Sequence, residues 1–349
     1  MPAVVARTDG AGWRVEGSWP DAGLANRFLA HLVVRAFAPA TVRAYAYDLV
    51  NFGRFCVEHG VRVVDAGPTD LFDYLEWQSS RRPARGGRVV RLAAAGPAPA
   101  TMNRRIAAVR AMFEFAVLAG VRADSPVPFP RRSSGLRASR RGVLGHVPAR
   151  HPRRGGRLVR QARRLPESLE PAEAAAFVAY LGTHRDRAMA LGMLLGGLRA
   201  GEVRGLRLAD VDMGLRRVRV VGKGGRERVV PIDRAFFAEL AAYLRGERLP
   251  GCLTAQCFVV LRGPRAGQAV TEAGMRRIFR SHRARSGASR VRPHRLRHTF
   301  GTQLAQAGID LLALRELMGH ASPETTAAYV HLAPAALAAA YAKARRAAP

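Results

Sequence analysis

The stretch Pro293-His-Arg-Leu-Arg-His-Thr-Phe300 sets the imidazole of His294 and the guanidinium of Arg297 three residues apart. Pro293 suits the first position of a helix, and side chains at positions i and i+3 of a helix share one face. The two groups can therefore converge on one phosphate. The bare pattern His-x-x-Arg identifies nothing, because it occurs five times in this arginine-rich chain. Its place at a helix start distinguishes this copy.

Other residues suited to phosphate chemistry precede and follow this stretch. Arg199 lies in Gly-Leu-Arg-Ala-Gly-Glu, where Glu202 is placed to hold it, and Lys223 occupies a Gly-Lys-Gly-Gly turn. His320 and Tyr329 come last. Arginines can bind phosphate oxygens in pairs, His and Lys can move protons, and a tyrosine can become covalently attached. This ordered set suits attack on a phosphodiester, although each member alone is weak evidence.

The composition predicts a polyanionic partner. The formal net charge of +31 over 349 residues favours DNA or RNA, with an anionic membrane as the competing partner. We find no apolar run of about 18 residues that would span a bilayer, and residues 1–17 lack the pattern of a signal peptide. A cytoplasmic, nucleoid-associated protein without a membrane partner is expected. Three cysteines cannot by themselves form a four-ligand zinc site, and we expect no metal site.

The fold class we expect is mainly α, with a small helical bundle followed by an α+β catalytic domain that contains a small antiparallel sheet. Residues 1–20 are expected to be a flexible tail. Residues 21–120 show four helical patterns, three of which we expect to be capped by threonines at 41, 69 and 101. Arginines on these helices that could follow a DNA backbone are Arg43, Arg54, Arg104, Arg105 and Arg110.

Residues 121–165 are expected to be a basic linker rich in proline and arginine. Twelve arginines and no acidic residue lie between positions 131 and 164. DNA contacts are expected from Arg131, Arg132, Arg140 and Arg141. Residues 166–349 form the second domain, with a helix from Pro171, two strands about the Gly-Lys-Gly-Gly turn, further helices, and an alanine-rich helical tail from 334.

The motifs Gly-Leu-Arg-Ala-Gly-Glu, Gly-Lys-Gly, His-Arg-Leu-Arg-His-Thr-Phe, Leu-Met-Gly-His and the Tyr329 segment together resemble the tyrosine recombinase (phage integrase) family, of the Xer-like two-domain type. Their order and spacing agree with the family throughout residues 165–331. In the first domain, Thr41-Val-Arg-Ala-Tyr-x-x-Asp-Leu is similar to the core-binding, SAM-like domain of the family. One departure is Gly196-Gly197, where the family often has Thr-Gly.

The resemblance implies a site-specific DNA recombinase or integrase that acts as a tetramer on paired sites in double-stranded DNA. It implies the active-site residues Arg199, Lys223, His294, Arg297, His320 and Tyr329. The tyrosine would form a 3′-phosphotyrosyl intermediate, with His294 as its general base, Lys223 as the acid for the leaving 5′-oxygen, and the remaining three stabilising negative charge. Because one phosphodiester is exchanged for another, neither a metal nor ATP is required, and no cofactor is expected.

Two other functions fit parts of the same sequence. A topoisomerase IB-like enzyme would use the same chemistry as a monomer to relax supercoils. A basic DNA-binding or architectural protein without catalysis would account for the charge, but not for the ordered catalytic set. The alanine-rich tail could dock on a neighbouring subunit or pack on its own domain, and the sequence leaves both open.

Overall fold

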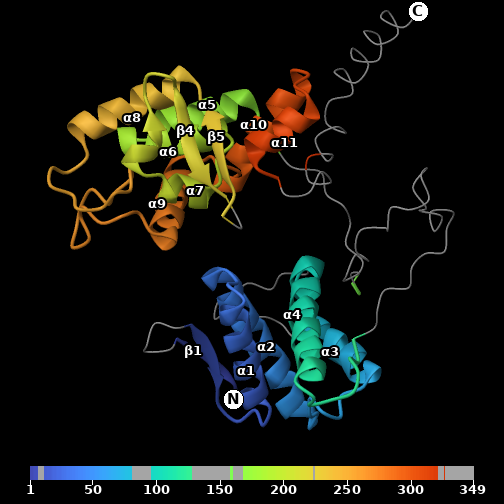
Figure 1. The fold of residues 1–349 in the computed structure, drawn as a ribbon. Coiled ribbons are helices and arrows are strands. Elements are labelled where there is room, and N and C mark those ends of the chain that lie inside the picture. Colours follow the sequence, from blue (N-terminus) through green and yellow to red (C-terminus); the bar gives the residue numbers. More distant parts are fainter. Residues whose placement is uncertain are drawn as a thin grey trace, which may run out of the picture. The chain divides into compact units, whose positions relative to one another are not determined.

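The computed structural model describes residues 1–6, 12–80, 96–127, 158–159, 168–222, 225–320 and 326. The chain divides into two compact units, Met1–Arg163 and Arg164–Pro349 (Figure 1). The first is a helical bundle with a two-stranded hairpin, and the second combines helices with a three-stranded antiparallel sheet. The predicted fold class, mainly α with a small antiparallel sheet, is confirmed. None of the helices in the described ranges is both long and apolar enough to cross a membrane.

The first unit is built around a core of aromatic and aliphatic side chains. Phe52 of the second helix meets Tyr74 and Phe113 edge-on, with ring centroids 5.1 and 5.9 Å apart. All three rings are buried. The described elements of this unit are β1 (Ala3–Ala6), β2 (Trp13–Glu16), α1 (Ala22–Val34), α2 (Pro39–His59), α3 (Pro68–Ser80) and α4 (Pro99–Leu118).

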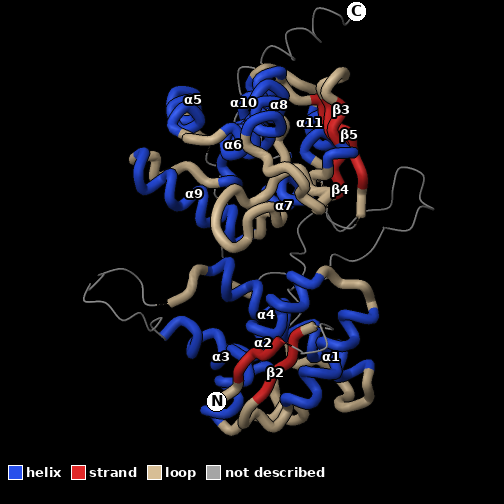
Figure 2. Tube along the Cα trace, turned by 90° about the vertical axis from the view of Figure 1, so that its left-hand side faces the viewer, coloured by secondary structure: helices blue, strands red, loops and turns tan. Residues whose placement is uncertain are grey.

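The prediction that residues 1–20 form a flexible tail is wrong. Strands β1 and β2 pair antiparallel and pack beside α1 and α2 (Figure 2). Val15 and Trp19 are 1% and 2% exposed, and the amide of Asn26 bonds both backbone groups of Val15. The Trp19 ring lies against Gly53, where a Cβ would come within 2.6 Å of it. Burial of these two apolar side chains and the backbone pairing of the hairpin stabilise the segment against its loss of conformational entropy.

The predicted threonine caps are also wrong. Helices α2, α3 and α4 begin one or two residues earlier, at Pro39, Pro68 and Pro99, and α2 and α4 have no side-chain cap. Proline has no N–H to leave unsatisfied in the first turn, and its fixed φ already suits a helix. The proline itself therefore marks each start.

The described residues that follow α4 pack with the first unit. Arg122 donates to the carbonyls of Val63 and Ala66, and Val127 is buried in the core. The linker prediction therefore began too early, at residue 121. Further along, the backbone of Val159 exchanges two hydrogen bonds with Asn103 of α4, at 2.9 and 3.1 Å.

In the second unit, helix α6 is central, with α8 and α10 packed against it (Figure 1). Residues alternate between buried and exposed along both long strands, and Val218 pairs with Val230 on the buried face. The described elements are α5 (Pro171–Tyr180), α6 (His184–Leu194), α7 (Ala200–Gly205), a 3-10 turn (Leu208–Asp210), β3 (Val211–Asp212), β4 (Arg217–Val221), β5 (Glu227–Pro231), α8 (Arg234–Gly246), α9 (Glu272–Ser286), α10 (Pro293–Gln306) and α11 (Leu311–Met318).

Several predictions for this unit are confirmed. Helix α5 begins at Pro171, α10 begins at Pro293, and strands β4 and β5 flank the glycine-rich turn. Strand β3 and helix α8 were not predicted. Helix α8 nevertheless carries a start signal, since the Asp233 side chain accepts from the N–H of Ala235.

Candidate active site

Three separate segments bring four of the predicted catalytic residues together. Arg199 is the N-cap of α7, His294 and Arg297 lie in the first turns of α10, and His320 follows the end of α11. The charges of Arg297 and Arg199 both act on the imidazoles of His294 and His320. Segments that lie far apart in the sequence of the second unit therefore meet at one cationic cluster, formed by Arg199, His294, Arg297 and His320.

The guanidinium of Arg199 is fixed from two sides. Nη1 donates to Oε1 of Glu202 at 2.6 Å, and Nη2 donates to the carbonyl of Gly319 at 2.5 Å. The other carboxylate oxygen of Glu202 accepts from the Arg199 backbone N–H at 2.8 Å. Glu202 thus holds Arg199 as the sequence predicted, while about a third of the arginine side chain stays exposed.

Arg297 is more deeply placed, with 4% exposure. It donates through Nη2 to the carbonyl of Met318 at 2.5 Å, and through Nη1 to the carbonyl of Gly197. Gly197 has a φ of +59°, and a Cβ there would come within 2.4 Å of the Phe300 ring. Glycine is therefore required at position 197, and Arg297 bonds its carbonyl even though the residue before it is also a glycine.

Arg228 belongs to the cluster and was missed from the sequence. Both of its terminal nitrogens bind the Glu202 carboxylate at 2.8 Å, and Nε donates to the carbonyl of Leu317 at 2.9 Å. Burial alone raises the pKa of Glu202, but hydrogen bonds from Arg228 and Arg199 hold it at about 2. The signal was available, because an arginine on the buried face of β5, two residues before Val230, requires a buried partner.

The histidines of the cluster are neutral near pH 7. Burial, and then the charges of Arg297 and Arg199, lower the pKa of His294 below its ordinary value and that of His320 to about 4. His298, which stacks on His294 with ring centroids 5.4 Å apart, has a pKa lowered to about 4 by burial, His294 and Arg297. A neutral imidazole can accept a proton, as a general base must.

These lowered values predict a pH dependence of stability. A histidine whose pKa is lower in the folded than in the unfolded protein favours unfolding as the pH falls from about 6.5 toward 4. We expect the melting temperature of a His298→Gln variant to fall less than that of the unaltered protein between pH 7 and pH 4.5. Thermal unfolding at a series of pH values measures this, and equal slopes for the two proteins would contradict it.

Two predicted catalytic residues, Lys223 and Tyr329, lie outside the described residues, but their described neighbours point to the cluster. A Cβ on Gly222, next to Lys223, would lie 3.6 Å from both Arg228 Nη1 and Glu202 Oε1. Near Tyr329, Nδ1 of His320 in the cluster lies 2.9 Å from the hydroxyl of Thr326, which precedes Tyr329 by three residues.

The predicted DNA-binding arginines of the first unit differ in their surroundings. The guanidinium of Arg43 lies 5.0 Å from the Trp13 ring centroid, Arg104 pairs with the buried carboxylate of Asp48, and Arg105 bonds Gln78 at 3.1 Å. Arg110 is 9% exposed and does not lie on the surface as expected. The expected contacts Arg131, Arg132, Arg140 and Arg141 lie outside the described residues.

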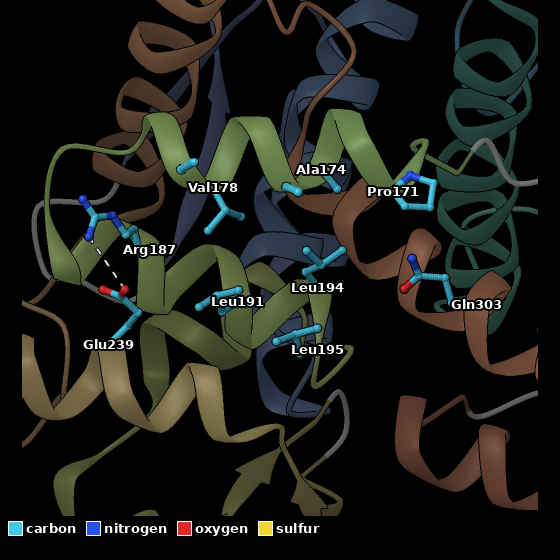
Figure 3. A pocket seen from close by; sticks show the side chains of 11 residues that line it. Pro171, Ala174, Val178, Arg187, Leu191, Leu194, Leu195, Glu239 and Gln303 are labelled. Carbon is cyan, nitrogen blue, oxygen red and sulfur yellow. Dashed lines mark ion pairs between the residues drawn. The ribbon is translucent and has the colours of Figure 1, made fainter.

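A separate groove in the second unit has a different character. Side chains of α5 and α6, including Ala174, Val178 and Leu194, line it, with Gln303 at one side (Figure 3). An ion pair between Arg187 and Glu239 crosses one end, with 3.7 Å between nitrogen and oxygen. The groove shares no residue with the arginine cluster and suits an apolar segment better than a phosphate.

Comparisons with known protein families agree with this arrangement. Residues 167–336 match the model of the "Phage integrase family", and residues 25–120 match that of the "Phage integrase, N-terminal SAM-like domain". The tyrosine recombinase XerC of Rhodospirillum centenum is 32% identical over 318 residues, covering 89% of this chain and 83% of that protein. XerC of Chromohalobacter salexigens is 33% identical, covering 88% and 90%.

Solved structures show the same fold at lower identity. The XerH site-specific recombinase bound to a palindromic difH substrate superposes with a TM-score of 0.60 at 18% identity, covering 93% of this chain and 90% of that one. The Tn1549 transposon integrase in complex with a circular intermediate DNA gives 0.61 at 17% identity, covering 93% and 99%.

The family matches show an enzyme that breaks and rejoins DNA strands, and the cationic cluster is consistent with that class. The chain belongs to the phage integrase family, the tyrosine recombinases.

Proposed function

We propose that this recombinase cuts a DNA strand by attack of Tyr329 on the scissile phosphate, leaving a 3′-phosphotyrosyl link and a free 5′-hydroxyl. The 5′-hydroxyl of a partner strand then attacks the link and restores the tyrosine. The observation that carries this proposal is the convergence of Arg199 and Arg297 with two neutral imidazoles. Two guanidiniums suit the non-bridging oxygens of one phosphate, where charge develops during in-line displacement.

The proposed roles follow from charge and protonation. The His294 imidazole is neutral and only partly enclosed by the protein, so it can take the proton of the Tyr329 phenol, whose ordinary pKa is near 10. Arg199, Arg297 and His320 stabilise the negative charge on the phosphorane. Lys223 protonates the leaving 5′-oxygen. Because the phosphotyrosyl link conserves the energy of the phosphodiester, the cycle requires neither a metal nor ATP.

A nicked DNA substrate tests the proposal, provided that cleavage releases a short 5′-hydroxyl fragment that diffuses away. We expect a protein–DNA adduct that survives denaturing electrophoresis and forms equally well in the presence of EDTA. A purely architectural DNA-binding protein would give no adduct. A topoisomerase-like enzyme would give the adduct but would relax supercoiled DNA without joining strands from two sites.

Lys223→Ala should slow strand cleavage by about 10² to 10⁴ because a general acid is lost. A substrate with sulfur in place of the bridging 5′-oxygen should recover most of this rate, since a thiolate leaves without a proton. Single-turnover cleavage of both substrates measures the effect. Lys343→Ala, which removes the only other lysine of the chain, is the matched control and should cleave normally. A Lys223→Ala defect of equal size on both substrates would exclude the acid role.

Assembly and DNA contacts complete the proposal. Pairing of two DNA sites calls for a tetramer, with Arg43, Arg104, Arg105 and the linker arginines on the DNA backbone. The apolar groove beside α5 and α6 supports docking of the alanine-rich tail, from the same or a neighbouring copy. Such a DNA-bound enzyme would reside on the nucleoid, in the cytoplasm.

A further inference from the structure

The C-terminal end of α11 is held by three arginines from three different elements. Its consecutive carbonyls at 317, 318 and 319 accept one hydrogen bond each, from Arg228 of β5 at 2.9 Å, from Arg297 of α10 at 2.5 Å and from Arg199 at 2.5 Å. The last carbonyls of a helix lack partners within the helix and carry its negative dipole end. Three positively charged side chains therefore bind carbonyl oxygens that carry partial negative charge.

Glu202 joins two of these arginines into one unit. Its carboxylate receives two parallel bonds from Arg228 and a third from the side chain of Arg199. Glu202 is an anion, and all three nitrogens of Arg228 already bond within the protein, two to Glu202 and one to the carbonyl of Leu317, so neither group is arranged to touch DNA. Arg199, with about a third of its side chain exposed, is the member that can reach a phosphate.

Gly319 fits closely between the same two guanidiniums. It has a φ of +60° at the C-cap of α11, and a Cβ there would come within 2.7 Å of Nη1 of Arg228 and 3.2 Å of Nη1 of Arg199. The next residue is His320, which contacts Thr326. A shift of Arg228 would therefore displace Arg199, through Glu202, and also the end of α11, through the carbonyl of Leu317. The segment that leads to Tyr329 follows that helix end.

We propose that Arg228 is a positioning residue for strand cleavage, which fixes the Arg199 guanidinium through Glu202 and fixes the end of α11 through the carbonyl of Leu317. This inference rests on the proposed function. It assigns Arg228 no contact with DNA. Its effect is to set the geometry of a guanidinium that binds phosphate and of a helix end that precedes the nucleophile.

Removal of Arg228 should disturb that geometry in a definite way. The buried Glu202 carboxylate would keep Arg199 as its only described side-chain partner, and would draw that guanidinium away from the phosphate. Lysine cannot replace Arg228, because one ammonium group cannot reach both carboxylate oxygens and the Leu317 carbonyl in the same planar arrangement. The defect should appear in the cleavage step itself, because the exposed DNA-contacting surface is unchanged.

The test compares Arg228→Lys and Arg228→Met with the unaltered protein in single-turnover cleavage of the nicked substrate, well below each melting temperature. We expect DNA affinity within about threefold and a cleavage rate constant lowered about 100-fold, because a small displacement of a positioned group suffices for such a loss. The matched control is Arg219→Met, on the same sheet but exposed and paired with Asp210. It should cleave normally.

A role in folding alone predicts a different result. It would lower the amplitude of cleavage, which counts folded molecules, and leave the rate constant unchanged. A substrate with a neutral methylphosphonate at the scissile position sharpens the distinction. A displaced Arg199 matters less when the phosphate lacks its charge, so the loss in Arg228→Lys should shrink to below about tenfold.

The outcomes separate this inference from the proposed function. If the unaltered protein forms no adduct, the proposed function fails. If it does, and Arg228→Lys cleaves with an unchanged rate constant, only the positioning role is overturned. An equal loss on the charged and the neutral substrate would also overturn it. Should Arg228→Met not fold, Arg228→Lys, which keeps a cation beside Glu202, still decides.

Discussion

A Tyr329→Phe variant is expected to bind DNA as tightly as the unaltered protein and to form no covalent adduct. The substitution removes a single oxygen and keeps the ring, so packing and charge are preserved. Without the phenol oxygen no phosphodiester exchange can begin, and adduct formation should fall by about 10⁴ or more, to background. Gel shift of the nicked substrate measures binding, and denaturing electrophoresis measures the adduct.

The chain offers a matched control for this experiment. Tyr341 belongs to the same C-terminal segment, twelve residues further on, and Tyr341→Phe should form the adduct at the normal rate. Peptide mapping of the trapped complex should place the nucleotide on Tyr329. An adduct in Tyr329→Phe, or its loss in Tyr341→Phe alone, would show that the nucleophile is assigned to the wrong tyrosine.

An Arg199→Lys variant is expected to lose about 10² to 10³ in the cleavage rate constant, the effect of removing one preorganised donor from a developing anion. Arg199 now bonds Glu202 and Gly319 through different nitrogens while part of its guanidinium faces solvent. A lysine has one point of attachment and would be held by Glu202 alone. The phosphate would then lose its fork-shaped partner.

Stability and DNA binding separate this effect from general damage. The charge is conserved in Arg199→Lys, so its affinity for the nicked substrate should change by less than about threefold. Arg217→Lys is the control, because Arg217 also bonds a carboxylate, that of Asp212, but on the exposed side of the sheet. A normal rate in Arg199→Lys would remove this residue from the site, whereas an equal loss in both variants would indicate a nonspecific effect of losing an arginine.

Local signals in the sequence were sufficient for much of the second unit. The starts of α5 and α10 were predicted because Pro171 and Pro293 are chemically specific for a first helical turn. The strands about the glycine-rich turn were predicted from the short valine-rich runs on either side of it. The same rules failed at residues 1–20. Val15 and Trp19 become buried only through packing against α1 and α2, and local sequence rules do not show such contacts.

For the site, the sequence supplied the candidate residues but only the nearest of their partners. Glu202 was identified as the partner of Arg199, because the two lie three residues apart. Arg228 lies 26 residues from Glu202, and its second acceptor, the carbonyl of Leu317, is 89 residues away. No periodicity spans such separations. The sequence likewise assigned no role to His298. The lowered pKa of this residue arises from burial and from the nearby His294 and Arg297, which only the folded structure shows.

By itself, the sequence determined the class of chemistry and the elements that carry it, because residue type fixes charge, protonation and helix starts within a few positions. Only the tertiary structure decided that three arginines share the end of α11 and that one buried carboxylate links two of them. The reason is physical: hydrogen bonds and Coulomb forces act over a few ångströms in space. Which groups come within that range is set by the packing of α6, α10 and the sheet, and no single segment contains that information.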